Sequence, residues 1–403
     1  MGSGPVKYCI IVPDGAADTP SPRLNDRTPL EAARTPNMDR AASDGLLGLV
    51  NNVPRRLSPG SAVAMMSVTG NDPLKYFTGR GPLEAADLGL RLEPGQWAVR
   101  CNLVTVADGR LADFTAGHIS TAEADLLLRA LQESLGSPEI SFHTGTSYRH
   151  VLIYTGPDPL NAETTPPHDV VGQAVRECLP SGKGAPLLLD LMQRSRALLE
   201  AHDVNHVRVD LGKNPANMIW LWGQGVAPDL EPFEARFGVR GAVISAVNLV
   251  RGIGRLIGWE VVDVPGATGY VETDFAAKGR YAIDALTRCD LVLVHVEAPD
   301  EASHEGDVQA KVRSIERVDS HIVGPLMAHA ADVPEGLRVL ILPDHLTSVE
   351  DGRHKRGAVP FAMWGAGVKA ASGCPYTEAH AAASDVEVDP GWQLMDQFIV
   401  PAP

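Results

Sequence analysis

The sequence has few cysteines and no long apolar run. Its 403 residues include five cysteines, which are widely spaced and form no Cys-x-x-Cys pair. A disulfide framework is therefore not expected, and this usage is typical of a reducing compartment such as the cytoplasm. The first apolar segment, residues 7–13, is too short for a signal peptide or a membrane span. We expect a cytoplasmic protein without a membrane anchor.

Positive charge is also scarce. Lys and Arg number 35 against 50 Asp and Glu, which gives a formal net charge of −15. Since there is no long basic run, this balance argues against binding to nucleic acid or to an anionic membrane surface. A small anionic substrate is still compatible, because one site needs only a few local cations. The sequence leaves the oligomeric state open.

Several nucleotide-binding and hydrolase motifs are absent. The sequence has no Walker A motif, no Rossmann glycine fingerprint and no Gly-x-Ser-x-Gly elbow. Hydrophobic residues make up 44% of the chain and charged residues 21%, which is close to the globular average and excludes wholesale disorder. The chain therefore has enough apolar material for a large core.

Short apolar runs alternate with helical patterns along both ends of the chain. The predicted elements are strands at 8–12, 291–296, 337–342 and 359–364 and helices at roughly 29–45, 278–288 and 306–330. This alternation predicts an α/β fold with a mostly parallel sheet.

The middle of the chain predicts a second, smaller α/β lobe. Strand-like segments lie within 97–113, 140–155 and 205–222, and helical patterns lie at 120–135 and 185–202. We expect this lobe to be an insertion. Residues 1–77 and 225–403 would then form one discontinuous domain, and residues 78–224 the inserted lobe.

Acidic residues follow three of the predicted strands. Asp14, Asp300 and Asp344 each lie just after an apolar run. Functional residues of parallel sheets gather beyond the carboxyl ends of the strands. His304 lies four residues after Asp300, one helical turn away, and His345 adjoins Asp344. Taken singly, each pattern is also typical of a turn or of a solvated surface pair.

Two further residues complete a set of candidate ligands. His354 lies in a basic loop, and Ser61 follows Gly60 at a predicted helix start. Ser61 is either an N-cap or a nucleophile beside the phosphate-binding N–H groups of that helix. The whole set supplies oxygen and nitrogen ligands for two metal sites. A mixture of carboxylates and imidazoles suits Mn²⁺ or Zn²⁺, with Mg²⁺ as an alternative, and two such ions allow a serine to attack phosphorus.

Short motifs throughout the chain carry a family resemblance. The segments are 12–15, 35–38, 60–61, 76–85, 100–102, 147–150, 167–169, 244–247, 264–269, 297–302 and 344–345. With these motifs the sequence resembles the archaeal-type branch of the cofactor-independent phosphoglycerate mutases, in the alkaline-phosphatase superfamily. The resemblance covers most of the chain.

The resemblance implies a fold and a role for each matching residue. It implies an alkaline-phosphatase-like, mostly parallel sheet sandwiched by helices, which binds the metals, and an inserted α/β transferase lobe, which binds substrate. The implied ligands are Asp14, Ser61, Asp344 and His345 for one metal ion and Asp300, His304 and His354 for the other. Ser61 is also the implied phosphorylated nucleophile. The implied substrate contacts are Arg100, Arg149, His150 and Lys278.

The sequence departs from the family pattern beside these residues. Ala62 replaces the acidic residue that usually follows the nucleophile, His118 replaces an arginine, and residues 355–357 read Lys-Arg-Gly in place of an acidic segment. The simplest function is interconversion of 2- and 3-phosphoglycerate. The departures leave two alternatives. One is a specialised paralogue that transfers a phosphoryl or phosphonate-type group to a glycerate-like acceptor in phosphonate natural-product metabolism. The other is a metal-dependent phosphatase. A catalytically inactive binding protein is disfavoured, because all seven metal and nucleophile positions are retained.

Overall fold

The strand β1 (Lys7–Pro13) lies at the centre of the fold and is buried along almost its whole length. Its apolar run shows no alternation, which is typical of a strand covered on both faces. In the computed structural model, which describes residues 6–369 and 371–399, β1 lies between β12 (Leu291–Val296) and β13 (Leu337–Ile341). Both neighbours run parallel to β1, so Ile10 lies opposite Leu293 and Leu340.

These three strands are the centre of an eight-stranded sheet. The strand order is β11-β10-β12-β1-β13-β16-β2-β17. The outer strands are β2 (Leu46–Val50), β10 (Gly241–Ile244), β11 (Glu260–Val261), β16 (Val359–Gly365) and β17 (Glu387–Val388). Only β16 runs antiparallel to its two neighbours, β13 and β2, within the described part of this sheet. The predicted α/β class with a mostly parallel sheet is therefore confirmed.

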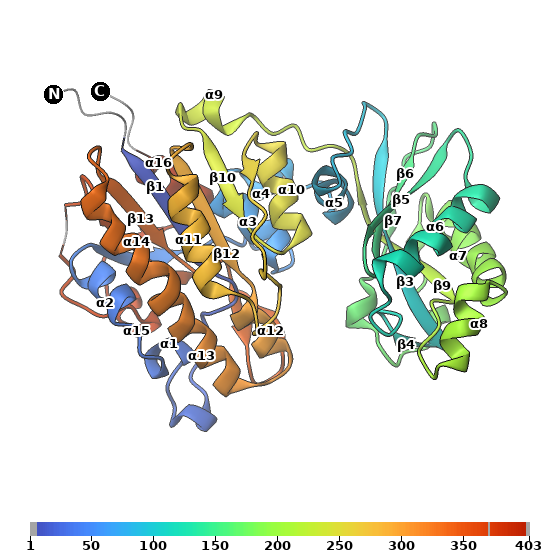
Figure 1. The fold of residues 1–403 in the computed structure, drawn as a ribbon, viewed down its shortest axis with the longest axis horizontal. Helices are drawn as coiled ribbons and strands as arrows, with labels where there is room; N and C mark the ends of the chain where they lie inside the picture. Colours follow the sequence, from blue (N-terminus) through green and yellow to red (C-terminus); the bar gives the residue numbers. More distant parts are fainter. Residues whose placement is uncertain (1–5, 370, 400–403) are drawn as a thin grey trace. The chain divides into compact units, whose positions relative to one another are not determined.

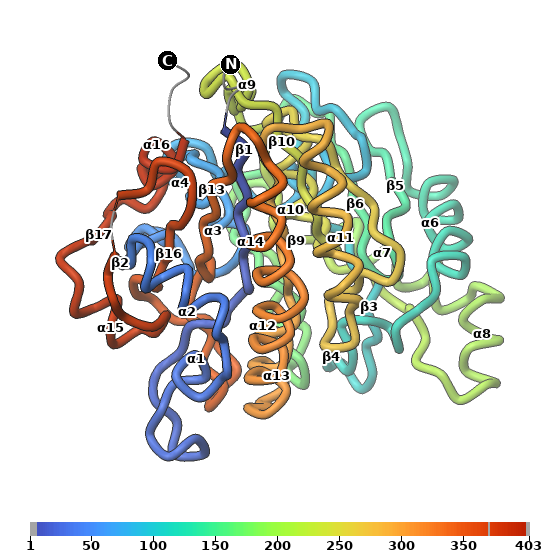
Figure 2. Tube along the Cα trace, turned by 60° about the vertical axis from the view of Figure 1, so that its left-hand side comes forward, coloured from blue at the N-terminus to red at the C-terminus, as the bar shows by residue number. Residues whose placement is uncertain are grey.

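Helices cover this sheet and connect its strands. Figures 1 and 2 show α11 (Phe275–Ala285), α13 (Val308–Val318) and α14 (Gly324–His329) beside one another, where the π-helical turn Asp319–Val323 joins α13 to α14. This run corresponds to the helix predicted at 306–330. The helix predicted at 29–45 is split into α1 (Pro29–Ala32) and α2 (Pro36–Ser43), because a proline starts each piece and cannot donate a backbone hydrogen bond.

The remaining elements of this unit are short. They are η1 (Pro22–Leu24), α3 (Ser61–Val68), α4 (Pro73–Tyr76), α9 (Phe233–Phe237), α10 (Asn248–Leu256), α12 (Ala298–His304), η5 (Ala330–Asp332), β14 (Leu346–Ser348), β15 (Arg353–Lys355), α15 (Glu378–Ala382), η6 (Gly391–Gln393) and α16 (Leu394–Phe398). No helix in the described ranges is long and apolar enough to cross a membrane.

Residues 78–229 form a second compact unit with its own sheet and core. Its sheet has the order β4-β3-β6-β5, and β9 also pairs antiparallel with β3, along residues 98–104. The strands are β3 (Trp97–Ala107), β4 (Arg110–Asp113), β5 (Ile140–Thr146), β6 (Arg149–Tyr154) and β9 (Met218–Gly225), with a small pair β7 (Ala162–Glu163) and β8 (Ser181–Gly182). The helices are α5 (Arg80–Asp87), α6 (Thr121–Leu135), η2 (Pro167–Asp169), η3 (Val175–Glu177), α7 (Ala185–Glu200) and α8 (Asp203–Asp210).

The start of α6 shows how local sequence sets an element in this unit. Ser120 accepts a hydrogen bond from the Glu123 amide, and the Glu123 carboxylate accepts one from the Ser120 amide. This reciprocal capping box satisfies two N–H groups that the helix itself leaves unpaired. Leu127, Leu128 and Leu131 then recur on one face and are buried against the sheet.

The structure locates the strand expected within 205–222. The first part of the strand-like segment 205–222 is the helix α8, and the strand β9 begins only at Met218. The buried Asn205 side-chain amide donates to the carbonyls of Leu199 and Ala216 and fixes the helix there. The second unit boundary lies after Asp229 rather than after residue 224, because β9 continues to Gly225.

We expect a cavity at the centre of the eight-stranded sheet to be strongly destabilising. Leu293 on β12 is fully buried, so Leu293→Ala should lower the free energy of unfolding by about 2–5 kcal/mol. Urea denaturation followed by circular dichroism measures this change. Leu74→Ala is the control, because Leu74 is 54% exposed, and its effect should stay within about 0.5 kcal/mol. Equal effects of the two substitutions would contradict the assignment of β12 to the core.

Candidate active site

The three acidic residues that follow predicted strands meet at one edge of the sheet. Asp14 comes directly after β1, Asp344 follows β13, and Asp300 lies in α12, which begins two residues after β12. Since β12, β1 and β13 are adjacent and parallel, their carboxyl ends lie side by side. All three carboxylates are buried. The chain therefore concentrates negative charge where it is least solvated.

A first group of candidate ligands surrounds Ser61. Ligand atoms of Asp14, Asp344 and His345 all lie within 4.8 Å of one another. The Ser61 hydroxyl lies 3.2 Å from Asp14 Oδ2 and 3.1 Å from His345 Nε2. The structure thus brings together the four residues that the resemblance assigns to one metal ion.

Ser61 is the first residue of α3, and Gly60 is the cap. Gly60 has φ of +150°, a conformation that favours glycine, and provides no side-chain capping bond. The first amides bonded within the helix are those of Val63 and Ala64, which both bond to the Gly60 carbonyl. The alternative of Ser61 as an N-cap is therefore wrong. Its hydroxyl instead faces the first ligand group.

A second group is formed by Asp300, His304 and His354. Asp300 Oδ2 lies 3.0 Å from His304 Nε2 and 3.6 Å from His354 Nε2, and the two ring nitrogens are 3.1 Å apart. His304 Nδ1 lies 2.7 Å from the Gly352 carbonyl, to which it donates. That bond orients the ring so that Nε2 points at Asp300 and His354. Three ligand atoms from two distant segments therefore converge.

The pKa values in the two groups reflect burial and crowding of charge. Burial, followed by the charges of Asp344 and Asp300, raises the pKa of Asp14 well above its usual value. Burial would also raise the pKa of Asp300, but hydrogen bonds from His304 and His354 hold it well below its usual value. Burial opposes protonation of His304, and the Asp300 carboxylate outweighs it and raises the pKa of His304 to about 9.

Both groups fit a divalent cation. Asp344 Oδ2 is buried and accepts no hydrogen bond from any residue that the structure describes, although His345 Nε2 lies 3.4 Å away. An unpaired buried carboxylate oxygen is costly unless a cation neutralises it. The donors are carboxylate oxygens, imidazole nitrogens and one hydroxyl, a mixture that suits Mn²⁺ or Zn²⁺. Asp14, Ser61, Asp344 and His345 would hold one ion, and the second group the other.

A buried histidine that the sequence analysis missed supports Asp14. His295, on β12, places Nε2 3.0 Å from Asp14 Oδ2 and Nδ1 3.2 Å from the Ser245 hydroxyl. Asp14, His295 and Glu297 also form a third group of possible ligands. The signal in the sequence was a single polar residue inside an otherwise apolar strand.

Lys278, an expected substrate contact, bonds to the backbone of this histidine. Its Nζ donates to the His295 carbonyl at 2.9 Å, and its side chain is almost fully buried in α11. Burial lowers the pKa of Lys278 to about 8, and the Glu297 charge opposes this shift. A role in substrate binding remains a prediction.

The second unit contains its own cluster of cationic side chains. Arg100, on β3, donates to Glu84 at 2.5 Å and to Asn102 at 3.4 Å. The guanidinium groups of Arg100 and Arg80 lie 4.7 and 5.1 Å from the ring centroid of Trp222. Burial lowers the pKa of Arg100 to about 10, so it remains charged at neutral pH. Arg80 and Trp222 were not identified from the sequence.

His150 lies on the neighbouring strand β6, opposite Cys101 and on the other face of the sheet from Arg100. Its Nδ1 accepts a hydrogen bond of 3.0 Å from the Gly145 amide, so the ring proton is on Nε2. Burial and the Arg100 charge lower the pKa of His150 to about 3. Nε2 is buried and bonds to none of the described residues. Arg149 precedes it on β6, beside the Tyr148 ring. All three residues lie on two paired strands, but Arg100 and Arg149 share one face of the sheet and His150 lies on the other, since Asn102 lies opposite Arg149 and Cys101 opposite His150.

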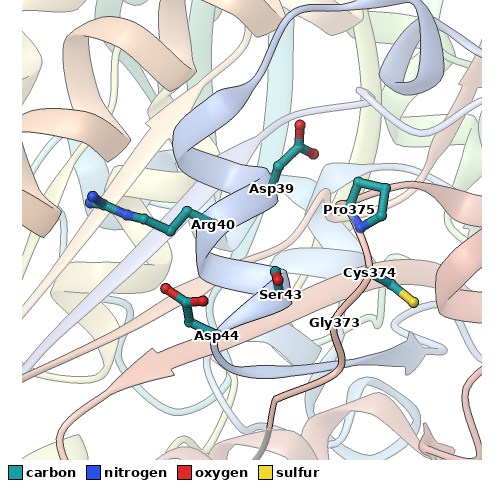
Figure 3. A pocket seen from close by; sticks show the side chains of 7 residues that line it. All are labelled: Asp39, Arg40, Ser43, Asp44, Gly373, Cys374 and Pro375. Carbon is teal, nitrogen blue, oxygen red and sulfur yellow. The ribbon is translucent and has the colours of Figure 1, made fainter.

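A separate hollow lies beside α2. It has a volume of about 310 Å³ and is lined by Asp39, Arg40, Ser43, Asp44, Gly373, Cys374 and Pro375 (Figure 3). The Tyr376 amide bonds to the Asp39 carboxylate at its edge. None of these lining residues belongs to the two ligand groups, so we assign the hollow no part in the site.

Fold and site together define an α/β protein with a serine and two groups of candidate ligands at the carboxyl edge of a mostly parallel sheet. The sequence profile of the family described as 2,3-bisphosphoglycerate-independent phosphoglycerate mutase matches residues 42–205. A curated protein of that name from Methanosarcina barkeri is 48% identical over 89% of this chain and 90% of its own length. Another, from Methanothermobacter thermautotrophicus, is 45% identical over 98% of both chains.

Solved structures agree with this assignment. A protein from Pyrococcus horikoshii has a TM-score of 0.81 at 28% identity, covering 98% of this chain and 96% of its own. A cofactor-independent phosphoglycerate mutase from Thermoplasma acidophilum has a TM-score of 0.63 at 27% identity, covering 98% of both chains. The chain belongs to the family of 2,3-bisphosphoglycerate-independent phosphoglycerate mutases.

The second ligand group makes a direct prediction about metal binding. His304→Ala removes one nitrogen donor and should weaken Mn²⁺ binding at one site by at least about 100-fold, since even outer-shell changes cost 10–100-fold. Isothermal titration calorimetry measures both sites. His329→Ala is a matched control, because His329 pairs with Asp332 on the surface and lies in neither group. Wild-type affinity in His304→Ala would exclude His304 as a ligand.

Proposed function

We propose that this protein interconverts 2- and 3-phosphoglycerate through a phosphoserine at Ser61, with two divalent metal ions bound at the two ligand groups. One observation carries the proposal. The Ser61 hydroxyl lies within hydrogen-bond distance of Asp14 and His345 at the start of α3, in a chain of this family. The start of a helix favours an anion, because its free N–H groups and dipole face the ligand.

The reaction is two transfers of one phosphoryl group. In the first, Ser61 Oγ loses its proton and bonds to phosphorus, while the bond from phosphorus to the substrate oxygen breaks and that oxygen takes up a proton. In the second, the other hydroxyl of the glycerate attacks the phosphoserine, loses its proton and releases the Ser61 hydroxyl. The two steps balance without water, oxidant or a second cofactor.

The ligand groups supply the electrostatic part of this chemistry. Asp14, Ser61, Asp344 and His345 would hold one ion, and Asp300, His304 and His354 the other. Divalent cations so bound would stabilise the charge on the phosphoryl group and ease deprotonation of the serine. Asp14 and His345 also orient the Ser61 hydroxyl, since both lie within about 3.2 Å of it.

We assign recognition of the acidic substrate to the cluster in the second unit. Arg100 and Arg149 bring positive charge on one face of two paired strands, while His150 on the other face stays a predicted contact. Charged donors such as these guanidinium groups prefer an anion. A carboxylate or phosphate of phosphoglycerate fits this set.

The departures beside the nucleophile do not favour a different substrate. Lys355 pairs with Asp351, so its charge is largely neutralised, and Arg356 donates to the Pro54 carbonyl at 3.3 Å. Ala62 is buried in α3, and His118 is exposed in the second unit. Lys355 and Arg356 therefore add less unpaired positive charge beside His354 than the sequence alone suggests. We therefore keep phosphoglycerate as the proposed substrate.

The products of one incubation separate the proposed activity from its alternatives. With Mn²⁺ and 3-phosphoglycerate, we expect 2-phosphoglycerate to accumulate without release of inorganic phosphate. Quantitative ³¹P NMR follows both products in the same sample. Release of phosphate as the main product would identify a phosphatase. If neither 2-phosphoglycerate nor inorganic phosphate forms, transfer to another acceptor would be favoured.

Ser61→Ala should abolish the interconversion. Loss of the nucleophile should lower kcat by more than about 10³-fold, while the fold persists because the hydroxyl caps no helix. Mass spectrometry of wild type quenched during turnover should find phosphate on Ser61. Ser67→Ala, in the same helix, is the control, because the Ser67 hydroxyl only bonds to the Asn52 carbonyl. A Ser61→Ala enzyme with substantial activity would indicate direct transfer between substrates.

Arg149→Ala should impair substrate recognition without affecting the metals. Loss of a charge-assisted bond worth about 1.5–3 kcal/mol should lower kcat/KM by about 10–100-fold. Steady-state kinetics and calorimetry with Mn²⁺ on the same preparation measure the two properties. The control is Arg194→Ala, an exposed arginine of the same unit that pairs with Asp190. An unchanged kcat/KM would remove Arg149 from the proposed contacts.

A further inference from the structure

Thr347 lies where the two ligand groups approach each other. It is the central residue of β14 and is fully buried. Its hydroxyl oxygen lies 2.5 Å from Asp300 Oδ1 and 3.1 Å from His345 Nδ1. Asp300 belongs to the second ligand group and His345 to the first. One hydroxyl therefore contacts a member of each group.

The two contacts determine where the protons are. A hydroxyl has one proton to donate, and an ionised carboxylate can only accept. Thr347 therefore donates to Asp300. Its second contact then requires His345 Nδ1 to carry the ring proton and to donate it to the Thr347 oxygen. In this tautomer His345 Nε2 has a free lone pair, and Nε2 is the atom beside Ser61.

The same hydroxyl also orients Asp300. With Oδ1 engaged by Thr347, Oδ2 is the oxygen that faces the two histidines, 3.0 Å from His304 Nε2 and 3.6 Å from His354 Nε2. The second carboxylate oxygen is thus left for the ligand group. Metal-binding imidazoles and carboxylates usually need such outer hydrogen bonds to hold their orientation.

Thr347 itself is held on three sides. Its amide donates to the Ala17 carbonyl at 3.1 Å, and its carbonyl accepts from Lys311 Nζ at 2.7 Å. Lys311 is buried and pairs with Asp18 at 3.0 Å. Gly15 passes so close that a Cβ there would lie 2.6 Å from the Thr347 hydroxyl. The hydroxyl therefore has little freedom to move away from its two partners.

We propose that Thr347 is a positioning residue that couples the two ligand groups, because its hydroxyl fixes the tautomer of His345 and the orientation of Asp300 together. The metal-binding half of this inference rests on the proposed function. The tautomer half does not, since it concerns a hydrogen bond within the protein.

The test compares two substitutions that differ in the hydroxyl. Thr347→Val keeps the branched shape and removes the hydroxyl, whereas Thr347→Ser keeps it. We expect Thr347→Val to weaken Mn²⁺ binding at both sites by about 10–100-fold, and Thr347→Ser to stay within about threefold of wild type. Calorimetry with Mn²⁺ gives both affinities. Thr105→Val is the matched control, because Thr105 is a buried strand threonine whose hydroxyl bonds to the Pro215 carbonyl in the second unit.

A second measurement needs no metal. In protein labelled with ¹⁵N-histidine, the ring signals of His345, assigned by their loss in His345→Gln, report which nitrogen carries the proton. We expect the proton on Nδ1 in metal-free wild type and in Thr347→Ser, and loss of that preference in Thr347→Val. A proton on Nε2 in wild type would overturn the inference whether or not Thr347→Val folds.

The outcomes separate the inference from the proposed function. Wild-type affinity at both sites in Thr347→Val, or a loss at one site alone, would overturn the coupling and leave the proposed function intact. A wild-type protein that binds no divalent cation would overturn the proposed function and the metal-binding half of the inference. The tautomer of His345 would then decide the remaining half.

Discussion

The structure depends on one electrostatic constraint, the close approach of three buried carboxylates. Asp14, Asp300 and Asp344 follow adjacent parallel strands and are all almost fully buried. Like charges in a poorly solvated site repel strongly, and the raised pKa of Asp14 expresses that cost. Neighbouring groups offset part of this repulsion. His295 forms a hydrogen bond with Asp14, and Thr347 donates one to Asp300. Asp344 Oδ2 has no such partner among the described residues, and a bound cation would neutralise it.

The α/β fold and this convergence were predictable because both follow from strand order. Apolar runs without alternation indicate buried parallel strands, and acidic residues at their carboxyl ends then share an edge. The helix spacing of Asp300 and His304 was equally visible, since residues four apart face the same way. The position of His354 beside these residues does not follow from strand order. His354 lies in the short strand β15, and it lies opposite Thr347 because β15 pairs with β14.

The supporting residues could not be predicted, because their partners are set by packing. His295 looks like a core residue in the sequence, and Thr347 like a strand residue after a turn. Their roles arise only because β12 and β14 bring them against Asp14 and Asp300. Likewise, Arg80 and Trp222 lie far apart in the chain, and they meet because α5 packs against β9.

Charge counted along the sequence also misrepresents the site. By sequence alone, Lys355 and Arg356 make the surroundings of His354 strongly positive, yet Lys355 pairs with Asp351 and Arg356 donates to a backbone carbonyl. An exposed ion pair of this kind contributes little field at a distance, because water and salt screen it. Under the proposed function, charged donors of the second unit would discriminate between substrates. Arg100 and Arg149 lie there on one face of two paired strands, where they would bind a carboxylate or phosphate. We therefore propose that substrate choice depends more on these residues than on the altered residues beside Ser61.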